Sequence, residues 1–454
     1  ATIRRQRQMC IRDSLLTEGF FYAILHLLIL YLMTISLRPH QKTCLNAMWK
    51  NDKGQIIVPT GGGKTYIMIA DFMKELQVRK AHTTVVVAPR ILLANQLCSD
   101  FFEHNLDNNH NLSIQCMHVH SGETGHYSTT KAKDIMMWHL MSNVNEARII
   151  FTTYHSLHRI VESNIPVDTI YFDEAHNSTG KNFFNAVKTI SKRIDNNCGS
   201  AYFFTATPRY GRGKSEERGM QNSDVYGHEI AKVSAKELID NGIILPPMIV
   251  PFDSNLNRNK VNAHEVDASN LKSILTDTIE DDSKVLVSAP STRVLMNMLS
   301  RTDILEWFKE NGFDVLHITS KYGAVINGKK VGRDQFFDTL NEWGHTDRKF
   351  VVFHYSILSE GINVAGLTHT VLLRNLPVIE MAQTIGRVIR IHPDDRKSVA
   401  DGIIPVAQYS LYRKSYGNVT VPLCGKHGQK IADRLNNVVN QIFVEGNPPI
   451  AWAS

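Results

Sequence analysis

The sequence has few cysteines, and none of them stands in an arrangement that predicts a cross-linked protein or a zinc ribbon. The chain holds six cysteines in 454 residues, and no two of them form a Cys-x-x-Cys pair. Disulfide frameworks and zinc ribbons need clustered cysteines, so neither class is expected here. Scattered free thiols fit a reducing compartment. We therefore expect a cytoplasmic protein.

Neither sign of charge dominates the chain, and no segment is of low complexity. The 50 lysines and arginines exceed the 44 aspartates and glutamates by six, and the isoelectric point is near 8.8. This mild excess permits a polyanionic partner without requiring one, because the basic residues are spread along the chain. Apolar residues make up 43% and charged residues 21%, as in ordinary globular proteins. The length of 454 residues predicts two or three domains.

Long apolar runs are also scarce, with one exception near the N-terminus. Phe20–Leu37 is uncharged over 18 residues and follows Arg4, Arg5, Arg7 and Arg12. This is the length of a marginal membrane span, but no second span and no small-residue cleavage site follow it. Because Gln8–Ser14 resembles translated adapter sequence, we expect residues 1–37 to be an N-terminal extension, an apolar helix partly foreign to the native protein. A membrane anchor is the alternative.

From Arg38 onward, short apolar runs alternate with helical patterns, which indicates an α/β fold with parallel sheets and crossover helices. Continuous apolar runs of this length are typical of strands that are covered on both faces. Five of them precede residue 245: Gln55–Val58, Thr83–Ala88, Ala147–Thr153, Thr169–Phe172 and Ala201–Phe204. Four more follow it: Lys284–Ser288, Val315–Thr319, Phe350–Phe353 and Thr370–Leu373.

Breaks in this alternation indicate where the domains divide. Gly211–Asp224 is polar and rich in glycine and predicts a mobile loop, whereas Leu245–Pro247 interrupts the pattern altogether. We therefore expect a first domain over residues 38–245 and a second over 246–425. An amphipathic pattern over Gln429–Val444 predicts that residues 426–454 form a C-terminal helix and tail that pack rather than react.

The stretch Val58–Thr65 (Val-Pro-Thr-Gly-Gly-Gly-Lys-Thr) stands between an apolar strand and a helical pattern. This layout cradles a phosphate, because the glycines let several backbone N–H groups point at one anion and the new helix adds its positive end. Lys64 would reach the β- and γ-phosphates of ATP, and the hydroxyl of Thr65 would bind Mg²⁺. Val58 replaces the first glycine of the strict pattern. The turn residues expected to hold the nucleotide are Thr60, Gly61, Gly62 and Gly63.

Two acidic residues follow the predicted strand Thr169–Phe172, at the end where an α/β sheet places its ligands. Asp173 is expected to hold Mg²⁺ through a bound water. Glu174 is expected to orient and deprotonate the attacking water. The pair alone would be an ordinary solvated strand end, and the phosphate-binding loop upstream is what favours the catalytic interpretation.

Asp173-Glu174-Ala175-His176 and Pro59-Thr-Gly-Gly-Gly-Lys-Thr65 resemble the core of superfamily 2 helicases of the DEAH/DExH group, over about residues 38–392. The resemblance implies two tandem RecA-like P-loop NTPase domains, ATP and Mg²⁺ as cofactors, and an ATP-dependent helicase activity. Arg38-Pro-His-Gln41 resembles the Q motif of this family, which implies that Gln41 reads the edge of the adenine.

Other motifs of the first domain resemble those that hold nucleic acid in this family. Ala88-Pro-Arg90 and Thr152-Thr-Tyr154 end two predicted strands and would hold phosphates rather than read bases. The residues expected to contact nucleic acid are thus Pro89, Arg90, Thr152 and Thr153. Thr205-Ala-Thr207 resembles the motif that couples hydrolysis to strand movement, and the residues with this implied coupling role are His176, Thr205, Thr207 and Gln383.

The second domain has two stretches that resemble the remaining helicase motifs. Gln383–Arg390 resembles motif VI, Q-x-x-G-R-x-x-R, and sets Arg387 and Arg390 three apart on one helical face. These two would reach across to the γ-phosphate as arginine fingers. Ser359–Asn363 resembles motif V, which implies nucleotide contacts by Gly361 and Asn363. Many relatives have aspartate at the position of Asn363.

The linker Val225–Ile230 and the following Glu237–Ile243 resemble those of phage recombination helicases (UvsW-like) and of type III restriction motor subunits. The G-R-A-G-R motif of DEAH RNA helicases is absent. We therefore expect DNA, single-stranded or branched, as the partner, with a role in replication, recombination or repair, in the host cytoplasm if a phage encodes the protein. The alternatives are an RNA helicase and the motor of a restriction complex with a separate nuclease. A non-enzymatic scaffold would be expected to lose Lys64, Glu174 or Arg390.

Overall fold

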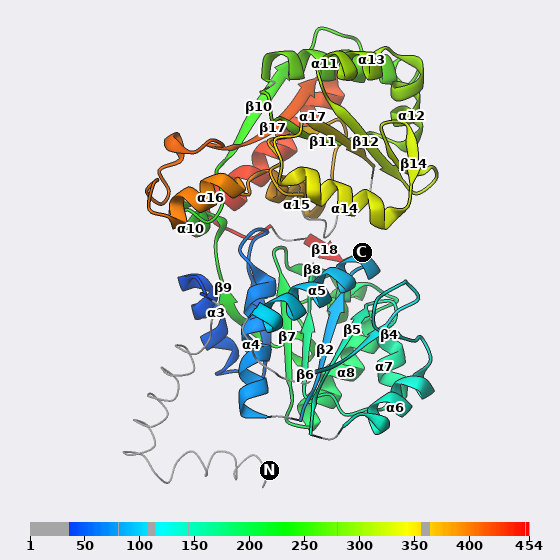
Figure 1. Ribbon diagram of the computed structural model, residues 1–454, viewed down its shortest axis with the longest axis vertical. Helices are drawn as coiled ribbons and strands as arrows, with labels where there is room; N and C mark the ends of the chain where they lie inside the picture. Colours follow the sequence, from blue (N-terminus) through cyan, green and yellow to red (C-terminus); the bar gives the residue numbers. More distant parts are fainter. Residues whose placement is uncertain are drawn as a thin grey trace.

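The computed structural model describes residues 36–79, 81–107, 114–143, 145–278, 280–355, 364–449 and 451–453, and its strands form two large sheets (Figure 1). The first sheet is in the lower half of Figure 1 and the second in the upper half. The helix predicted over residues 20–37 lies almost entirely outside the described residues. Within the described ranges, every helix is too short or too polar to cross a bilayer.

The first sheet has the strand order β4-β3-β5-β2-β6-β7-β1-β9, and all its neighbouring strands are parallel. Its strands are β1 Lys53–Ile57, β2 Thr83–Ala88, β3 Ile114–Val119, β4 Tyr127–Ser128, β5 Ala147–Thr153, β6 Thr169–Phe172, β7 Ser200–Thr205 and β9 His228–Lys232. The connecting helices are α4 Lys64–Val78, α5 Ile91–Asp107, α6 Ala132–Met141, α7 Leu157–Ser163, η1 Ala175–Thr179 and α8 Phe184–Asn196. Helix α3 Pro39–Met48 precedes β1, and α10 Ala235–Asp240 follows β9.

Helices cover both faces of this sheet, which explains its continuous apolar strands. Successive side chains of a strand point to opposite faces. In β2, Val86 joins the core under α4, whereas Val85 and Val87 join the core under α7 and α8. All six residues of β2 and all seven of β5 are buried. The five apolar runs predicted before residue 245 are therefore confirmed as strands.

The second sheet has the order β10-β17-β16-β11-β15-β12-β13-β14 and is parallel except at the edge formed by β13 and β14. Its strands are β10 Pro247–Asp253, β11 Lys284–Ser288, β12 Asp314–Thr319, β13 Gly323–Ile326, β14 Lys329–Val331, β15 Phe350–His354, β16 His369–Leu372 and β17 Gly417–Leu423. Its helices are α11 Ala263–Thr278, α12 Thr292–Arg301, α13 Ile304–Glu310, α14 Arg333–Gly344, α15 Val378–Val388, α16 Pro393–Ala400, η4 Tyr409–Leu411, α17 Gly425–Val439 and η5 Asn440–Val444.

Two expectations differ from the structure. The second sheet carries an antiparallel hairpin, β13–β14, whose turn residues Asn327 and Gly328 both have positive φ, at 47° and 76°. Such a turn matches the twist of two antiparallel strands.

The prediction of a mobile loop over Gly211–Asp224 is wrong. Instead, the segment holds the end of β8 Arg209–Gly211, the short helix η2 Gly213–Arg218 and the start of α9 Ser223–Tyr226, and the amide of Gln221 exchanges two hydrogen bonds with the backbone of Gly211.

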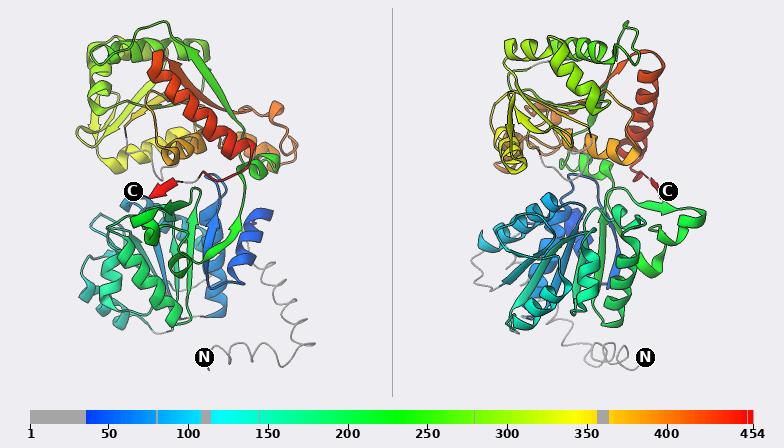
Figure 2. Two further views of the ribbon diagram at one scale, coloured as in Figure 1. Left: turned by 180° about the vertical axis from the view of Figure 1, so that it is seen from behind. Right: turned by 90° about the vertical axis from the view of Figure 1, so that its right-hand side faces the viewer.

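The chain crosses between the two sheets twice. The first crossing runs from the end of β9 to Pro247 at the start of β10, and the predicted boundary at 245/246 falls within it and stays a prediction. In the second crossing, the chain leaves α17 and η5 and ends in β18 Ala451–Ala453, which pairs with β8. We call the part built around the first sheet, with β8, the first half, and the part built around the second sheet the second half. Figure 2 shows α17 lying against the second sheet and β18 returning to the first. The guanidinium of Arg212 lies 3.3 Å from the ring centre of Trp452.

The carboxyl group of Asp71, on the buried face of α4, lies in the interior of the first half. Its two oxygens accept hydrogen bonds from the indole Nε1 of Trp49, at 3.0 Å, and the hydroxyl of Tyr171, at 2.8 Å. Only 3% of Asp71 is exposed. Burial raises the pKa of this carboxyl from 3.8 to about 6.

We expect the stability of the protein to fall as the pH rises through the range in which Asp71 ionises. The folded protein holds this proton more tightly than the unfolded chain, so ionisation between about pH 4 and pH 6 costs roughly 2–3 kcal/mol of the free energy of unfolding. Asp71→Asn should remove this slope because the amide does not ionise. Urea unfolding of both proteins at about pH 4.5, 5.5 and 7 measures the difference. A pH-independent difference between them would contradict the assignment.

Candidate active site between the two sheets

The loop of residues 58–63, between β1 and α4, turns tightly because it contains three glycines. Gly61 and Gly63 have positive φ angles of 88° and 77°, which favour glycine. A Cβ atom on Gly63 would lie 2.3 Å from the Nε2 atom of Gln41, and one on Gly62 would lie 2.5 Å from Val58. Helix α4 begins directly afterwards, at Lys64. The loop therefore presents its backbone N–H groups and a helix start to the same space, as predicted for a phosphate site.

Residues of α3 support this loop from behind. The Nε2 atom of Gln41 donates to the carbonyl of Gly63 at 3.2 Å, and its Oε1 accepts from the backbone N–H of Arg38 at 2.9 Å. The Nε2 atom of His40 lies 2.8 Å from the carbonyl of Gly62. In this structure both ends of the Gln41 amide thus contact the protein. Its predicted contact with adenine stays a prediction.

The end of β6 places two carboxyl groups beside the loop. Asp173 is only 7% exposed, and Glu174 has a positive φ of 44°, a backbone strain that residues other than glycine adopt mainly at functional sites. The Nζ atom of Lys64 lies 3.4 Å from Oε1 of Glu174. The Nδ1 atom of His176 lies 3.5 Å from Oε2 of Glu174 and 3.0 Å from the hydroxyl of Thr205.

The pKa values of these two neighbouring carboxyl groups, Asp173 and Glu174, are shifted in opposite directions. Burial, followed by repulsion from Glu174, raises the pKa of Asp173 to about 7. Burial also acts to raise the pKa of Glu174, but the positive groups Lys64, His176 and Arg387 outweigh it and lower that pKa overall. Glu174 is therefore ionised and able to accept a proton. A cation beside the buried Asp173 would offset its desolvation, and the hydroxyl of Thr65 lines the same space, so these two residues fit Mg²⁺.

The second half of the molecule closes this site from the opposite side. A cavity of about 340 Å³ is lined by Lys64, Thr65, Asp173 and Glu174 and, from the other half, by Gln383, Arg387, Arg390 and Arg396. Helix α15 approaches the loop so closely that a Cβ atom on Gly386 would lie 2.6 Å from the Cβ of Thr60. Glycine is thus required at this position of Q-x-x-G-R-x-x-R. Burial, followed by repulsion from Arg396, lowers the pKa of Arg390 to about 10, so its guanidinium is still charged at neutral pH.

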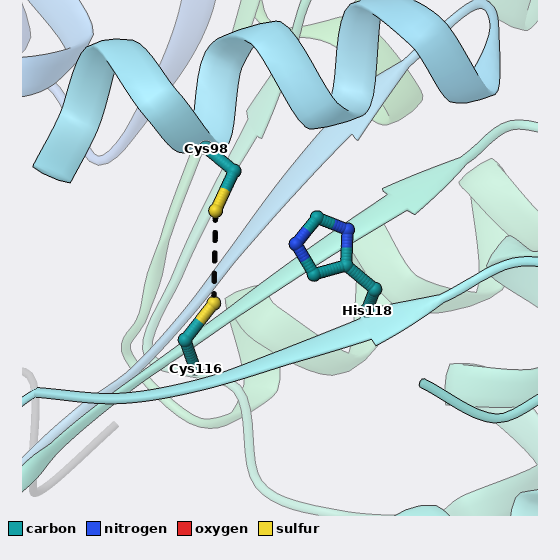
Figure 3. A group of neighbouring side chains, drawn as sticks. All are labelled: Cys98, Cys116 and His118. Carbon is teal, nitrogen blue, oxygen red and sulfur yellow. Dashed lines mark hydrogen bonds between the residues drawn. The ribbon is translucent and has the colours of Figure 1, made fainter. Parts of the chain in front are cut away.

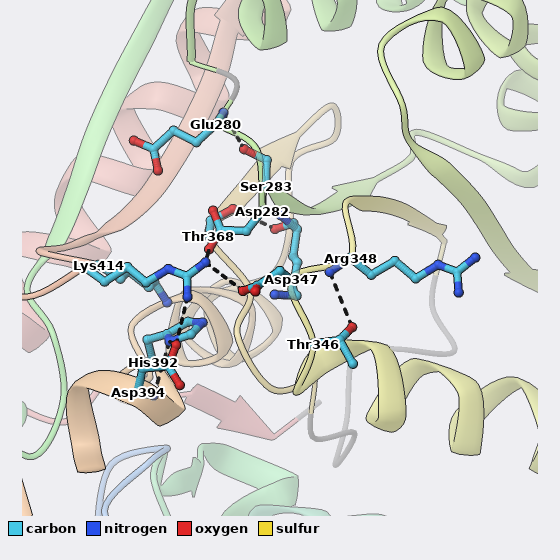
Figure 4. A network of polar contacts seen from close by, with 12 residues as sticks. Glu280, Asp282, Ser283, Thr346, Asp347, Arg348, Thr368, His392, Asp394 and Lys414 are labelled. Carbon is cyan, nitrogen blue, oxygen red and sulfur yellow. Dashed lines mark hydrogen bonds and ion pairs between the residues drawn. The ribbon is translucent and has the colours of Figure 1, made fainter. Parts of the chain in front are cut away.

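A polar network contacts the segment that carries these arginines, and Figure 4 shows Asp282, Asp347, Asp394 and Lys414 of this network. The Nζ atom of the buried Lys414 donates to the carbonyls of Val388, at 2.5 Å, and Arg390, at 2.9 Å. Its neighbour Arg413 pairs with three carboxylates, those of Asp282, Asp347 and Asp394. The lysine therefore ties down the end of α15, where the hydrogen-bonding carbonyls have no partner within the helix.

A second cavity, of about 860 Å³, lies beside the nucleotide cavity and is also shared by both halves. The first half contributes Pro89 and Arg90 after β2 and Thr153 at the end of β5, and the second contributes Arg333, Asp334 and Phe337 of α14. Thr152 lies outside it. Because neighbouring residues of a strand alternate in direction, its side chain is buried, and its hydroxyl donates to the carbonyl of Val119 at 2.9 Å.

The sequence-predicted site residues fall into groups. The nucleotide cavity brings together Thr60, Gly61, Gly63, Lys64, Thr65, Asp173, Glu174, Gln383, Arg387 and Arg390. Gly62 and Gln41 lie in and behind the loop, and Gly361 and Asn363 lie outside the described residues. Thr205 contacts both His176 and the backbone of Thr207, which connects the end of β6 to the end of β7.

The prediction missed several residues that line the cavities. Arg396 at the nucleotide cavity comes from α16, and Asp100 and Glu103 come from α5. The two acids stand three apart in a largely apolar helix, which is a signal that sequence reading could have used. Arg333 and Phe337 of α14 offered no comparable signal, because their importance depends on where the second half is placed.

Comparisons with known proteins agree with this geometry. The family model described as "Type III restriction enzyme, res subunit" matches residues 34–210, which span β1 to β8. The type ISP restriction-modification enzyme LlaBIII, solved bound to DNA, aligns with a TM-score of 0.64 over 92% of this chain at 16% identity. This chain therefore shares the fold of that enzyme. None of the curated proteins matches the sequence.

Two further solved structures share this fold. A fragment of a putative HsdR subunit of a type I restriction enzyme from Vibrio vulnificus aligns with a TM-score of 0.57 at 16% identity, over 91% of this chain and 67% of that one. Mss116p, bound to single-stranded RNA and AMP-PNP, aligns with a TM-score of 0.59 at 16% identity, over 97% and 79%. This chain spans only 31% of the length of LlaBIII.

Proposed function

We propose that this chain is an ATP-dependent DNA helicase or translocase that unwinds or remodels DNA, branched DNA included, in replication, recombination or repair. One observation carries the proposal. A single cavity joins Lys64, Thr65, Asp173 and Glu174 of the first half to Arg387 and Arg390 of the second. Such a site can respond to nucleotide by bringing the two halves together.

Each side chain of the cavity has a role in phosphoryl transfer. Lys64 holds the β- and γ-phosphates, and Glu174 orients the attacking water and accepts its proton. Arg387 and Arg390 neutralise charge that develops on the γ-phosphate. Thr65 and Asp173 would hold Mg²⁺, which would neutralise negative charge on the phosphates.

Contacts that run from Glu174 to Thr205 support our proposal that the nucleotide is coupled to the nucleic acid. Glu174 lies next to His176, which contacts Thr205, and both cavities have walls from both halves. Closing the halves around ATP therefore changes the shape of the neighbouring cavity, where Arg90 and Thr153 would hold phosphates. Repeated closure and opening would move the protein along a strand. We place this work in the cytoplasm, of a host cell if a phage encodes the protein.

Two alternatives share the same motor. The match to a restriction Res subunit favours a motor of a restriction complex, acting with a separate nuclease. The RNA in the Mss116p structure favours an RNA helicase. We prefer DNA because LlaBIII, which aligns with a TM-score of 0.64, is solved bound to DNA.

The ATPase rate with different nucleic acids separates these alternatives. Single-stranded DNA, duplex, fork, four-way junction and RNA are compared side by side at equal nucleotide concentration. We expect DNA to stimulate hydrolysis, with the fork or junction the strongest. Stimulation by RNA alone would overturn the choice of DNA, and equal stimulation by plain duplex would favour a restriction-type translocase.

Replacing Lys64 with alanine is expected to abolish nucleic-acid-stimulated ATPase, by at least about 10²-fold, because the loop loses the cation that reaches the phosphates. Lys50→Ala, at an exposed position just before β1, is the matched control and should keep the wild-type rate. Steady-state ATPase with saturating DNA is the measurement. Wild-type turnover by Lys64→Ala would remove this residue from the mechanism.

A further inference from the structure

Two cysteines and a histidine of the first half face one another beneath α5 (Figure 3). Cys98 comes from α5, whereas Cys116 and His118 stand two apart on β3 and so lie on the same face of the sheet. The two sulfur atoms are 3.8 Å apart, and all three potential ligand atoms lie within 4.8 Å of one another. The proposed function uses none of these three residues.

The Nε2 atom of His118 is buried without a hydrogen-bond partner among the described residues, which suggests that it binds a ligand. His118 is fully buried, and its Nδ1 atom lies 2.9 Å from Nε2 of His120. Its own Nε2 atom has no hydrogen-bond partner among the described residues, and Figure 3 shows one ring nitrogen turned toward the two sulfur atoms. A buried polar nitrogen without a partner costs free energy. A metal ion between this nitrogen and the sulfurs would remove that cost.

The spacing of the sulfur atoms suits a tetrahedral metal site. Two thiolates bound to one Zn²⁺ at about 2.3 Å, at tetrahedral angles, stand about 3.8 Å apart. The observed sulfur separation is the same, 3.8 Å. Two cysteines and one histidine are soft to borderline ligands, which select zinc over magnesium or calcium. Three protein ligands leave the fourth position for water.

We propose that Cys98, Cys116 and His118 form a binding site for a thiophilic metal ion of the zinc type. Binding releases one proton from each thiol, and the imidazole binds through Nε2. The ring proton of His118 then sits on Nδ1 and is donated to His120, the kind of support that metal-binding histidines commonly have.

Metal binding would also change hydrogen bonds in the wall of the larger cavity, of about 860 Å³, where we propose that nucleic acid binds. The Nδ1 atom of His120 accepts a hydrogen bond from the N–H of Gly122 at 3.2 Å, which places the proton of the neutral ring on Nε2. When His118 donates instead, the proton of His120 moves to Nδ1 and the contact with Gly122 is released. His120 and Gly122 both line the larger cavity, as do residues of α5. The ion thus joins α5 to β3 and adjusts the cavity wall between them.

Cobalt titration of the full chain tests the site. The protein is purified with a chelator and a reductant, its six thiols are counted, and Co²⁺ is added without oxygen. We expect one equivalent to bind with the thiolate charge-transfer band and visible bands of tetrahedral cobalt, and Zn²⁺ to displace it. Cys98→Ser and Cys116→Ser should lose the charge-transfer band, His120→Ala should weaken binding roughly 10–100-fold, and Cys198→Ser, at an exposed cysteine, should bind as wild type.

Two results would overturn the proposal. A reduced wild-type chain that shows no such bands at one equivalent has no metal site at these residues. Bands that persist unchanged in Cys116→Ser come from other ligands. The first result needs no variant, so the test holds even if a serine variant fails to fold. Neither result touches the proposed ATPase, which the Lys64 experiment measures separately.

Discussion

Replacing Arg387 with alanine is expected to lower the ATPase turnover number by roughly 10³–10⁵-fold, the range found for arginine fingers. Arg387 comes from α15 in the second half, is 4% exposed and lines the nucleotide cavity opposite Lys64. Its charge also helps to lower the pKa of Glu174 across the gap. The loss should appear in the turnover number more than in ATP binding, because Arg387 acts on charge that develops during the reaction.

Two companion variants sharpen this measurement. Arg387→Lys keeps the charge without the planar fork and should recover only part of the rate. Arg301→Ala, at an exposed position at the end of α12, should leave the rate unchanged. An Arg387→Ala protein that weakens ATP binding but keeps its turnover number would show that this arginine serves binding alone.

Replacing Glu174 with glutamine is expected to lower turnover by roughly 10²–10⁴-fold, which is the usual loss when a general base is removed. Glutamine has the same shape but cannot take a proton from water. Glu174 also faces Lys64 at 3.4 Å, and ATP would draw that lysine onto its phosphates and free the carboxylate. We therefore expect the variant to bind ATP as tightly as wild type, or more tightly.

Single-turnover ATPase and fluorescent-nucleotide binding together measure this prediction. Glu162→Gln is the matched control, since Glu162 is exposed on α7 and pairs only with Arg159 among the described residues. Equal loss of binding and of turnover would mean that Glu174 holds the site together rather than accepting a proton. Unchanged turnover would assign the base to another residue.

The parts of the fold that the sequence predicted well are those determined by local chemistry. β2 and β5 are buried on both faces, so their apolar runs could be read directly, and the limits of β2, β5, β6 and β11 agree with the predicted runs. The tight turn before Lys64 could also be predicted, because the positive φ angles that it needs at Gly61 and Gly63 favour glycine. The edge strand β9 has exposed or half-buried residues throughout and so carries no such pattern, and its first residues fall within the predicted linker Val225–Ile230.

The parts that could not be predicted depend on contacts between distant segments. Nothing near Lys414 indicates that its ammonium group supports the end of α15, and Gly386 is needed only because Thr60 lies against it. Thr152 and Thr153 look alike in sequence, but only Thr153 lines the cavity. Cys98 and Cys116 are 18 positions apart, so no Cys-x-x-Cys pattern marks them in the sequence.

The return of the chain end to β8 has a mechanical consequence. A body joined to another at one point can swing and twist freely, whereas two joints confine it to rotation about the line through both. The halves are joined by the segment before β10 and again between Val444 and Ala451, a stretch whose full extension is roughly 25 Å. As long as β18 stays paired with β8, any movement of one half against the other is therefore limited to rotation about the line through both connections, and a full twist requires β18 to unpair first.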